Sequence, residues 1–397
     1  MVKKVLYWAP CLNKVGTYYS TINSAISIEK YSKGSFKPVI INVCGEWNES
    51  EDLLKQNNVE IIKFYKKNFF KYLPKNGFLK SRFSYLTIAI LSIIPLIKFL
   101  NKNKNEILII HLIITLPLLL KFIFNLKIKT ILRISGFPKL NILRKNIWKS
   151  SNKILEYITC PTKDLLEQIK EAKIFNNQKV LFLPDAIINI NTMNRKINNI
   201  NEVVGTKTIL AAGRLTKQKN FLYLLQEFEK FLKIKKDYKL IILGEGEKKS
   251  EIQNYIKKNN ISDHVYLKGY VKNIFSYMKN SDLFVLSSLW EDPGFVIIEA
   301  AFSNLFVISS NCPNGPKEIL DNGRGGILFK SNEEGALLNS FIEFDKLSSD
   351  DRVYKKVILK KNISKYTIFK HFKTLETILK KINVNCLKME ELVLNNY

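Results

Sequence analysis

Short apolar segments alternate with helical stretches along most of the chain. In the second half, the predicted strands are 208–212, 240–243, 265–267, 282–286, 305–309 and 327–329. After the first of these, Phe221, Leu224, Leu225 and Phe228 form one apolar stripe, which predicts an amphipathic helix. Strands separated by helices at this spacing predict a parallel sheet that is covered on both faces.

The first half of the chain shows the same alternation less regularly. Its predicted strands are 2–7, 39–43, 60–63, 107–111, 130–134 and 158–160, and none is followed by an obvious carboxylate. A length of 397 residues suits two domains. We therefore expect an α/β chain of two Rossmann-like doubly wound domains that face a central cleft, and we expect this cleft to hold the ligands.

The domain boundaries follow from local composition. The polar, Asn-rich segment 189–206 predicts a linker. It separates a first domain, 1–188, from a second domain, 207–365. Residues 366–397 are predicted to form a helical tail that could cross back to the first domain.

Charge is unevenly distributed. The formal net charge is +28, and residues 1–200 contribute +20 of it, with 32 Lys and Arg against 12 Asp and Glu. A field of this sign attracts nucleic acid, anionic membranes or phosphorylated ligands. The five cysteines are scattered without a C-x-x-C motif, which argues against a disulfide framework or a zinc site and suits a reducing cytosol. No secretory signal is expected, because the apolar segment 5–9 is too short and runs into Pro10.

One region of the first domain has the composition of a membrane-surface segment. Residues 63–82 hold seven basic residues, no acidic residue and six aromatics, and the apolar segment 85–100 follows. This combination is typical of proteins that lie on an anionic membrane. Pro95 and Lys98 interrupt the apolar segment, which has about the minimum length for a span. The alternative is a solvated basic loop over a core helix.

The segment 287–303, SSLWEDPGFVIIEAAFS, carries two glutamates in a specific setting. Glu291 falls in the loop after the strand 282–286, and Glu299 falls inside the following helix among apolar residues. A carboxylate there is costly unless something hydrogen-bonds to it, which favours ligand binding. The alternative is a glutamate that reaches solvent on one face of the helix.

A second polar cluster follows the strand 208–212. Arg214 and Lys219 flank a tight loop at a predicted helix start, where free N–H groups and the helix dipole add positive potential. These features predict a diphosphate site that needs no metal, and the chain has no Asp-x-Asp motif for a metal-bridged diphosphate. The alternative is a pair of surface cations. Gly294 would let a phosphate approach the backbone.

Five segments resemble, in order and spacing, the motifs of the family-4 retaining GT-B glycosyltransferases, which use nucleotide-sugar donors. They are AAGRLTKQKN at 211–220, LIILGEGE at 240–247, VYLKGYV at 265–271, SSLWEDPGFVIIEAA at 287–301 and NGPKEIL at 314–320. The first domain matches only loosely. The family usually has a Gly-Gly pair after its first strand, and this chain has only Gly16 there.

The resemblance implies a role for each matching residue. Arg214 and Lys219 would bind the donor diphosphate, Glu299 the ribose and Glu291 the donor sugar. The further donor-binding residues that it implies are Gly16, Gly213, Gly244, Gly246, Tyr270, Val271, Gly294, Phe295 and Val296. It gives His111 a place beside the donor sugar, and hence a catalytic role with Glu291, Arg214 and Lys219; the alternative for His111 is a core histidine. Arg133, Ser135 and Gly136 would face the acceptor.

The expected reaction is transfer of a sugar from a UDP-sugar to a lipid-linked glycan, with retention of configuration and without metal or other cofactor. The segment CPNGPKE, 312–318, resembles enzymes of capsule, O-antigen and lipid-linked oligosaccharide assembly. The expected location is the inner face of the plasma membrane, with no nucleic-acid partner. Two alternatives remain open: a basic nucleic-acid-binding protein, against which Glu291 and Glu299 argue, and a non-catalytic membrane-attached scaffold of the same fold.

Overall fold

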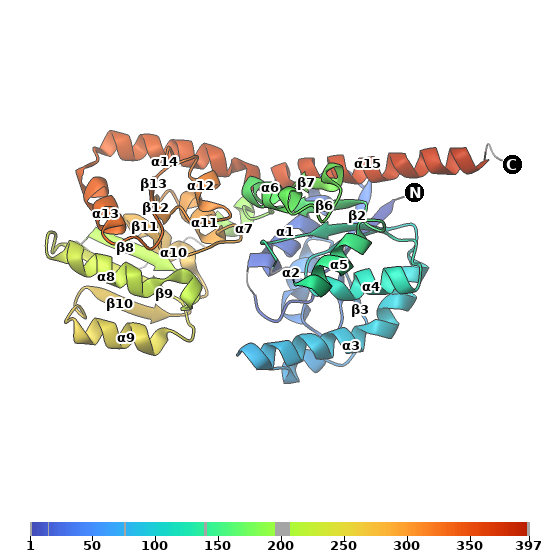
Figure 1. Ribbon diagram of the computed structural model, residues 1–397, viewed down its shortest axis with the longest axis horizontal. Helices are drawn as coiled ribbons and strands as arrows, with labels where there is room; N and C mark the ends of the chain where they lie inside the picture. The colour runs from blue at the N-terminus through green and yellow to red at the C-terminus, as the bar shows by residue number, and fades with distance from the viewer. Residues whose placement is uncertain (1, 15, 75–76, 139–140, 195–206, 395–397) are drawn as a thin grey trace. The chain divides into compact units, whose positions relative to one another are not determined.

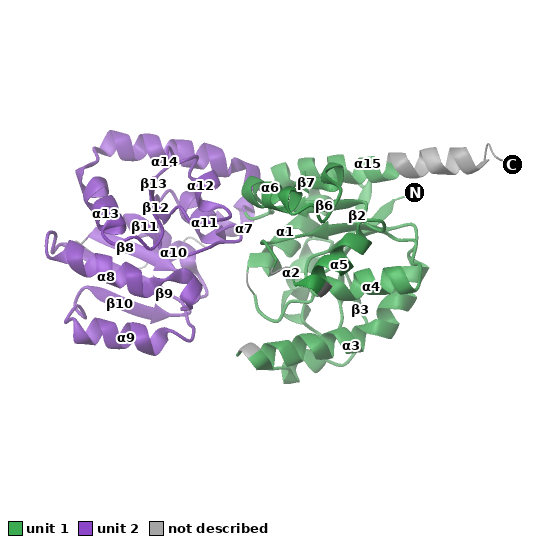
Figure 2. Ribbon diagram, viewed as in Figure 1, with its two compact units in different colours: residues 1–187, 368–397 green, residues 188–367 purple. Residues whose placement is uncertain are grey.

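The chain divides into two compact units. The computed structural model describes residues 2–14, 16–74, 77–138, 141–194 and 207–394, without the side chains of 78, 143 and 384–394. Unit 1 comprises residues 1–187 and 368–397, and unit 2 comprises residues 188–367 (Figure 2). The first residues of the predicted linker form helix α7 (Ile190–Asn194), and 195–206 lie outside the described residues.

Unit 1, whose residues up to 187 are coloured blue to green in Figure 1, contains a seven-stranded sheet. Its order is β3-β2-β1-β4-β5-β6-β7, with every neighbouring pair parallel. The strands are β1 (Lys3–Trp8), β2 (Phe36–Asn42), β3 (Glu60–Lys63), β4 (Ile107–Ile110), β5 (Lys129–Arg133), β6 (Tyr157–Cys160) and β7 (Val180–Phe182). The prediction of a parallel sheet is confirmed. Strand β7 was not predicted, because three residues are too few to establish a hydrophobic pattern.

Helices cover both faces of this sheet. Alternate residues of β1 separate the two cores: Tyr7 packs with α1 (Gly16–Tyr31), α2 (Glu51–Gln56) and α15 (Ile368–Leu394). Trp8 lies in the cluster on the other face, with α3 (Phe78–Lys102), α4 (Thr115–Ile123), α5 (Ile142–Ser151) and α6 (Lys163–Glu171). Phe372, Leu375 and Leu379 of α15 are fully buried in the α1 cluster, so the C-terminal helix is part of unit 1.

Unit 2 contains a six-stranded parallel sheet in the order β10-β9-β8-β11-β12-β13. The strands are β8 (Lys207–Ala212), β9 (Tyr238–Leu243), β10 (Val265–Gly269), β11 (Leu283–Leu286), β12 (Phe306–Ser310) and β13 (Ile327–Phe329). The helices are α8 (Phe221–Leu232), α9 (Lys249–Lys258), α10 (Ile274–Lys279), α11 (Phe295–Phe302), α12 (Pro316–Ile319), α13 (Ala336–Lys346) and α14 (Ser349–Ile363). Both units are therefore doubly wound α/β domains, as predicted.

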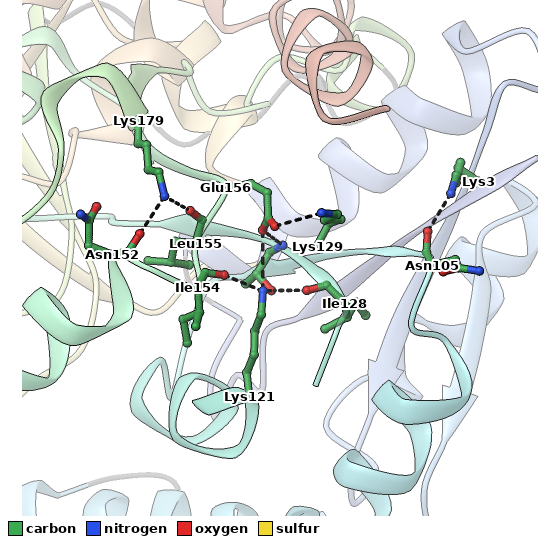
Figure 3. Close-up of polar contacts among 11 residues, drawn as sticks. Lys3, Asn105, Lys121, Ile128, Lys129, Asn152, Ile154, Leu155, Glu156 and Lys179 are labelled. Carbon is green, nitrogen blue, oxygen red and sulfur yellow. Dashed lines mark hydrogen bonds and ion pairs between the residues drawn. The ribbon is translucent and has the colours of Figure 1, made fainter. Parts of the chain in front are cut away.

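A buried lysine ties α4 to the sheet of unit 1 (Figure 3). Lys121 Nζ donates to Thr130 Oγ1 at 3.0 Å and to the Ile154 carbonyl at 2.5 Å, and lies 3.7 Å from Glu156 Oε2. The side chain is only 8% exposed. Burial lowers the pKa of Lys121 from 10.5 to about 8, because the charged form loses hydration.

This depressed pKa predicts a pH-dependent stability. Between pH 8 and 10.5 the unfolded chain holds the Lys121 proton more tightly than the folded chain, so the folded state is favoured as pH rises through this window. Relative to Lys121→Met, we expect the free energy of unfolding of the wild type to rise by roughly 1–3 kcal/mol between pH 7.5 and 10. Urea unfolding of both proteins at the two pH values measures it; an unchanged difference would contradict the assignment.

Candidate active site

Arg214 and Lys219, which were predicted to bind one diphosphate, have different surroundings in the loop after β8. Arg214 is exposed, whereas the Lys219 side chain is 13% exposed and turns inward. Its Nζ lies 2.5 Å from Glu291 Oε1. A Cβ on Gly213 would lie 2.9 Å from Lys219 Cε, so the glycine makes room for the inward course of the lysine.

Glu291 is the buried partner in this ion pair. Its side chain is 5% exposed, and Oε1 accepts hydrogen bonds from Lys219 Nζ and from Ser288 Oγ, both at 2.5 Å. Ser288 is held in turn through its carbonyl, which accepts from Ser310 Oγ at 2.6 Å and from Ser331 Oγ at 3.1 Å. Sequence reasoning missed Ser288; the signal was a hydroxyl three residues before Glu291 in the same loop.

Helix α11 begins directly after this loop. Gly294 precedes it at φ +93°, a conformation that strongly favours glycine. Phe295 and Val296, both half-buried, form its first turn, where backbone N–H groups have no intrahelical acceptor and the dipole is positive. Glu299 lies one turn further along and is half-buried. The Glu291–Glu299 segment therefore joins a buried carboxylate, a helix N-terminus and a second carboxylate.

The other glycines predicted to contact the donor have a packing role. A Cβ on Gly244 would lie 1.9 Å from the Gly213 carbonyl oxygen, and one on Gly246 would lie 2.3 Å from that of Leu215. Glycine is thus needed for the loop after β9 to pack against the loop after β8. Tyr270, after β10, is 71% exposed. Val271 beside it is half-buried.

In unit 1, His111 lies directly after β4 and is 4% exposed. Its backbone N–H donates to the Trp8 carbonyl at 2.8 Å, and Nδ1 is 3.4 Å from Thr21 Oγ1. Burial and the neighbouring charge of Arg133 lower the pKa of His111 well below its ordinary value. The imidazole is therefore neutral at pH 7 and can exchange hydrogen bonds without carrying charge.

Arg133, at the end of β5, forms a bidentate ion pair with Asp185. Nε lies 2.8 Å from Oδ1 and Nη2 lies 2.5 Å from Oδ2, with side chains 5% and 2% exposed. Asp185 follows β7 and also accepts from Ser20 Oγ at 3.1 Å. The prediction that no carboxylate follows a strand in the first domain was wrong, because β7 went unrecognised. Ser135 and Gly136 are half-buried after β5, and Gly16 is the half-buried first residue of α1.

A large exposed apolar surface lies on α3 and α4. The helix Leu79–Lys102 is long and apolar enough to cross a membrane. Only 28% of its apolar 18-residue stretch is buried against the rest of the protein. Ile88, Leu96 and Leu100 are fully buried on one face. We define the α3–α4 surface by the exposed apolar residues of these helices and by Phe124, which directly follows α4. The helical residues are Leu79, Phe83, Leu86, Ile90, Ile93, Ile94, Leu119, Phe122 and Ile123. Helix α3 is thus amphipathic with respect to the core.

The stretch of sequence that contains this surface is strongly basic. Residues 61–155 contain 19 Lys and Arg and a single acidic residue, Glu106. Lys66, Lys67 and Lys71, just before α3, are exposed. Lys75 lies outside the described residues.

Residues 192–365 match the family model described as glycosyl transferases group 1. The match covers less than half of the chain. It coincides with unit 2 and contains the Lys219–Glu291 pair and helix α11. Among the described residues of the whole chain, no group of three or more His, Cys, Asp or Glu side chains is arranged to hold a metal ion.

Named relatives are glycosyltransferases. An uncharacterized glycosyltransferase of Methanocaldococcus jannaschii is 47% identical over 108 residues, 27% of each chain. The N-acetylgalactosamine-N,N'-diacetylbacillosaminyl-diphospho-undecaprenol 4-alpha-N-acetylgalactosaminyltransferase of Campylobacter jejuni is 28% identical over 56% of this chain and 63% of its own. The chain thus matches less than two thirds of the length of either relative.

The similarity in fold extends beyond the matched residues 192–365. The crystal structure of Anabaena HepE in complex with UDP superposes with a TM-score of 0.70 over 96% of this chain and all 100% of that chain, at 12% identity. The predicted GT-B fold is therefore confirmed for both units.

The buried Lys219–Glu291 pair of unit 2 gives a stability prediction. Lys219→Met leaves the Glu291 carboxylate buried without its cation, which should lower the free energy of unfolding by about 3 kcal/mol. The double variant Lys219→Met/Glu291→Gln removes both charges and should recover part of this loss. Urea unfolding of the three proteins checks it. Equal stability of Lys219→Met and wild type would show that the pair contributes nothing.

Proposed function

We propose that this protein transfers a sugar from a UDP-sugar to a lipid-linked glycan acceptor, with retention of the anomeric configuration. The observation that carries the proposal is the Lys219–Glu291–Ser288 arrangement beside the N-terminus of α11, in the part of the chain that matches the glycosyl transferase model. The Campylobacter relative is named for an undecaprenol-diphosphate-linked acceptor, and HepE was crystallised with UDP. Both names support the same class of substrates here.

Donor binding follows from charge. A buried carboxylate alone would repel a diphosphate, and Lys219 cancels the charge of Glu291 at 2.5 Å. The exposed Arg214 guanidinium and the first N–H groups of α11 can then bind the diphosphate and stabilise the charge that develops as it leaves. Glu299 accepts hydrogen bonds from the ribose, and Glu291 from a hydroxyl of the donor sugar. This set of groups needs no metal or other cofactor.

The chemical step is a substitution at the anomeric carbon. The bond to the UDP oxygen breaks, the bond to the acceptor oxygen forms on the same face, and the departing diphosphate takes the acceptor proton. The neutral His111 imidazole contributes a hydrogen bond rather than a charge. Arg214 and Lys219 act where negative charge is largest, so they favour the transition state over the bound donor.

We also propose that the protein lies on the anionic cytoplasmic face of the plasma membrane. The α3–α4 surface offers apolar side chains for insertion between headgroups, and the exposed lysines before α3 attract anionic lipid. Exposed apolar side chains of this size favour a bilayer over nucleic acid as the partner. A lipid-linked acceptor is held at the same surface.

UDP should raise the melting temperature, and EDTA should not remove the effect, because the diphosphate site is built from Arg214, Lys219 and α11. A strict requirement for magnesium or manganese would rule out the metal-free site.

Glu299→Ala should weaken UDP binding by roughly 1–3 kcal/mol through loss of charge-assisted hydrogen bonds. Glu291→Gln retains a hydrogen-bonding side chain and leaves the Lys219 charge uncompensated, so it should not weaken UDP binding but should lower turnover. Calorimetry with UDP separates the two, and equal affinity losses would refute the division of roles.

Vesicle binding should have a salt-dependent and a salt-resistant component. Replacing Lys66, Lys67 and Lys71 with Ser should weaken binding to anionic vesicles at low salt, by about 1 kcal/mol per lysine. Replacing Leu86, Ile90, Phe122 and Ile123 with Ser should remove the component that survives 0.5 M salt, since apolar burial is not screened. Co-sedimentation over a salt series measures both. Wild-type behaviour of both variants would exclude this surface, and unchanged UDP binding is the control.

A further inference from the structure

A directed chain of hydrogen bonds joins helix α15 to the sheet of unit 1. His371 on α15 is 4% exposed, and its Nδ1 lies 2.6 Å from the Pro184 carbonyl oxygen. Its Nε2 lies 2.8 Å from Ser24 Oγ on α1. Ser24 Oγ is in turn 2.8 Å from the Tyr7 hydroxyl on β1.

The partners determine where the protons lie. A carbonyl oxygen only accepts, so His371 Nδ1 must carry hydrogen. Burial lowers the pKa of His371, and the ring is neutral, which leaves Nε2 as an acceptor for the Ser24 hydroxyl. Ser24 Oγ then accepts from Tyr7, whose pKa burial raises. The chain therefore runs from Tyr7 through Ser24 and His371 to Pro184.

The end of this chain is next to the Arg133–Asp185 ion pair. Pro184 directly precedes Asp185, so the bond from His371 holds the backbone from which the Asp185 carboxylate reaches Arg133. Asp185 accepts from Arg133 Nε and Nη2. Arg133 Nη1 is buried and has no hydrogen-bond partner among the residues that the structure describes. Its two N–H groups are costly to leave unpaired, and an incoming ligand oxygen would satisfy them.

The charge of this site selects the kind of oxygen. Asp185 cancels the charge of Arg133, and His111 beside them is neutral. A site without net charge suits a neutral hydroxyl better than a phosphate, because a phosphate would bring uncompensated charge into a buried position.

We propose that Asp185 and His371 are positioning residues, which hold Arg133 so that Nη1 donates to a hydroxyl of the acceptor sugar. The proposal rests on the proposed glycosyltransferase function. Helix α15, the last element of the chain, is then needed for acceptor recognition as well as for the core of unit 1. Neither residue touches the substrate itself.

The kinetic test compares matched variants, with a synthetic polyprenyl-diphosphate disaccharide and a UDP-sugar as probes. Asp185→Asn and His371→Leu should raise the acceptor KM by about tenfold, equivalent to one lost hydrogen bond, with UDP affinity unchanged. His371→Asn, which keeps an N–H for the Pro184 carbonyl, should stay within about threefold of wild type. Ile378→Val, a buried change on α15 away from the chain, controls for loosened packing.

A spectroscopic test does not depend on activity. The chain has only three histidines, so selective ¹⁵N labelling and the His371→Asn spectrum identify the His371 signals. We expect the neutral Nδ1–H form, and we expect His371→Leu but not Ile378→Val to shift the Arg133 Nε–H resonance. A His371 ring protonated on Nε2, or an Arg133 Nε–H resonance that does not shift in His371→Leu, would overturn the positioning role.

The two tests separate the two proposals. If wild type transfers sugar but the acceptor KM is unchanged in Asp185→Asn and His371→Leu, the network is only structural and the inference fails. If wild type transfers no sugar, the proposed function fails, and the acceptor role with it, while the spectra still decide whether His371 positions Arg133. The acceptor KM should rise equally for the polyprenyl-diphosphate disaccharide and for the same disaccharide on a neutral lipid. A rise confined to the diphosphate probe would show that Arg133 Nη1 binds phosphate, and would also contradict the inference.

Discussion

A buried charge is costly unless an opposite charge or hydrogen bonds compensate for lost hydration. Each unit contains a compensated ion pair beyond the carboxyl ends of its strands. In unit 2, Lys219 and Ser288 converge on one oxygen of Glu291. In unit 1, Asp185 holds Arg133 through two parallel bonds. Parallel strands bring these distant residues to one edge of a sheet, and the desolvation cost keeps them paired. The proposed chemistry depends on both pairs.

The two pairs differ in what they leave available. The Glu291 pair adjoins the N-terminus of α11, so its neighbourhood suits an anionic diphosphate. The Arg133 pair is neutral and lies beside a neutral histidine, so its unpaired Nη1 suits a hydroxyl. The same principle of paired burial thus produces one site for a charged group and one for an uncharged group.

The basic first half of the chain also has a structural counterpart. Exposed lysines precede α3 in the sequence. One face of α3 packs in the core, and the other exposes Leu86 and Ile90 as part of the α3–α4 surface. Helix α3 is long and apolar enough to span a membrane, but its buried face packs against the sheet of unit 1. The proposed attachment parallel to the bilayer would keep both faces of α3 in apolar surroundings.

Local periodicity and spacing were enough to predict the alternation of strands and helices, both doubly wound sheets and the segment that holds Glu291 and Glu299. Sequence reasoning missed β7 and, with it, Asp185, because three residues show no period. It also grouped Arg214 with Lys219, although one is exposed and the other is paired with Glu291. The pairing of Lys219 with Glu291 became apparent only in the folded chain. The same holds for the bond from His371 on α15 to the Pro184 carbonyl. A pairing between residues 72 or 187 positions apart depends on which strand ends and helices meet in space, and local sequence does not encode that.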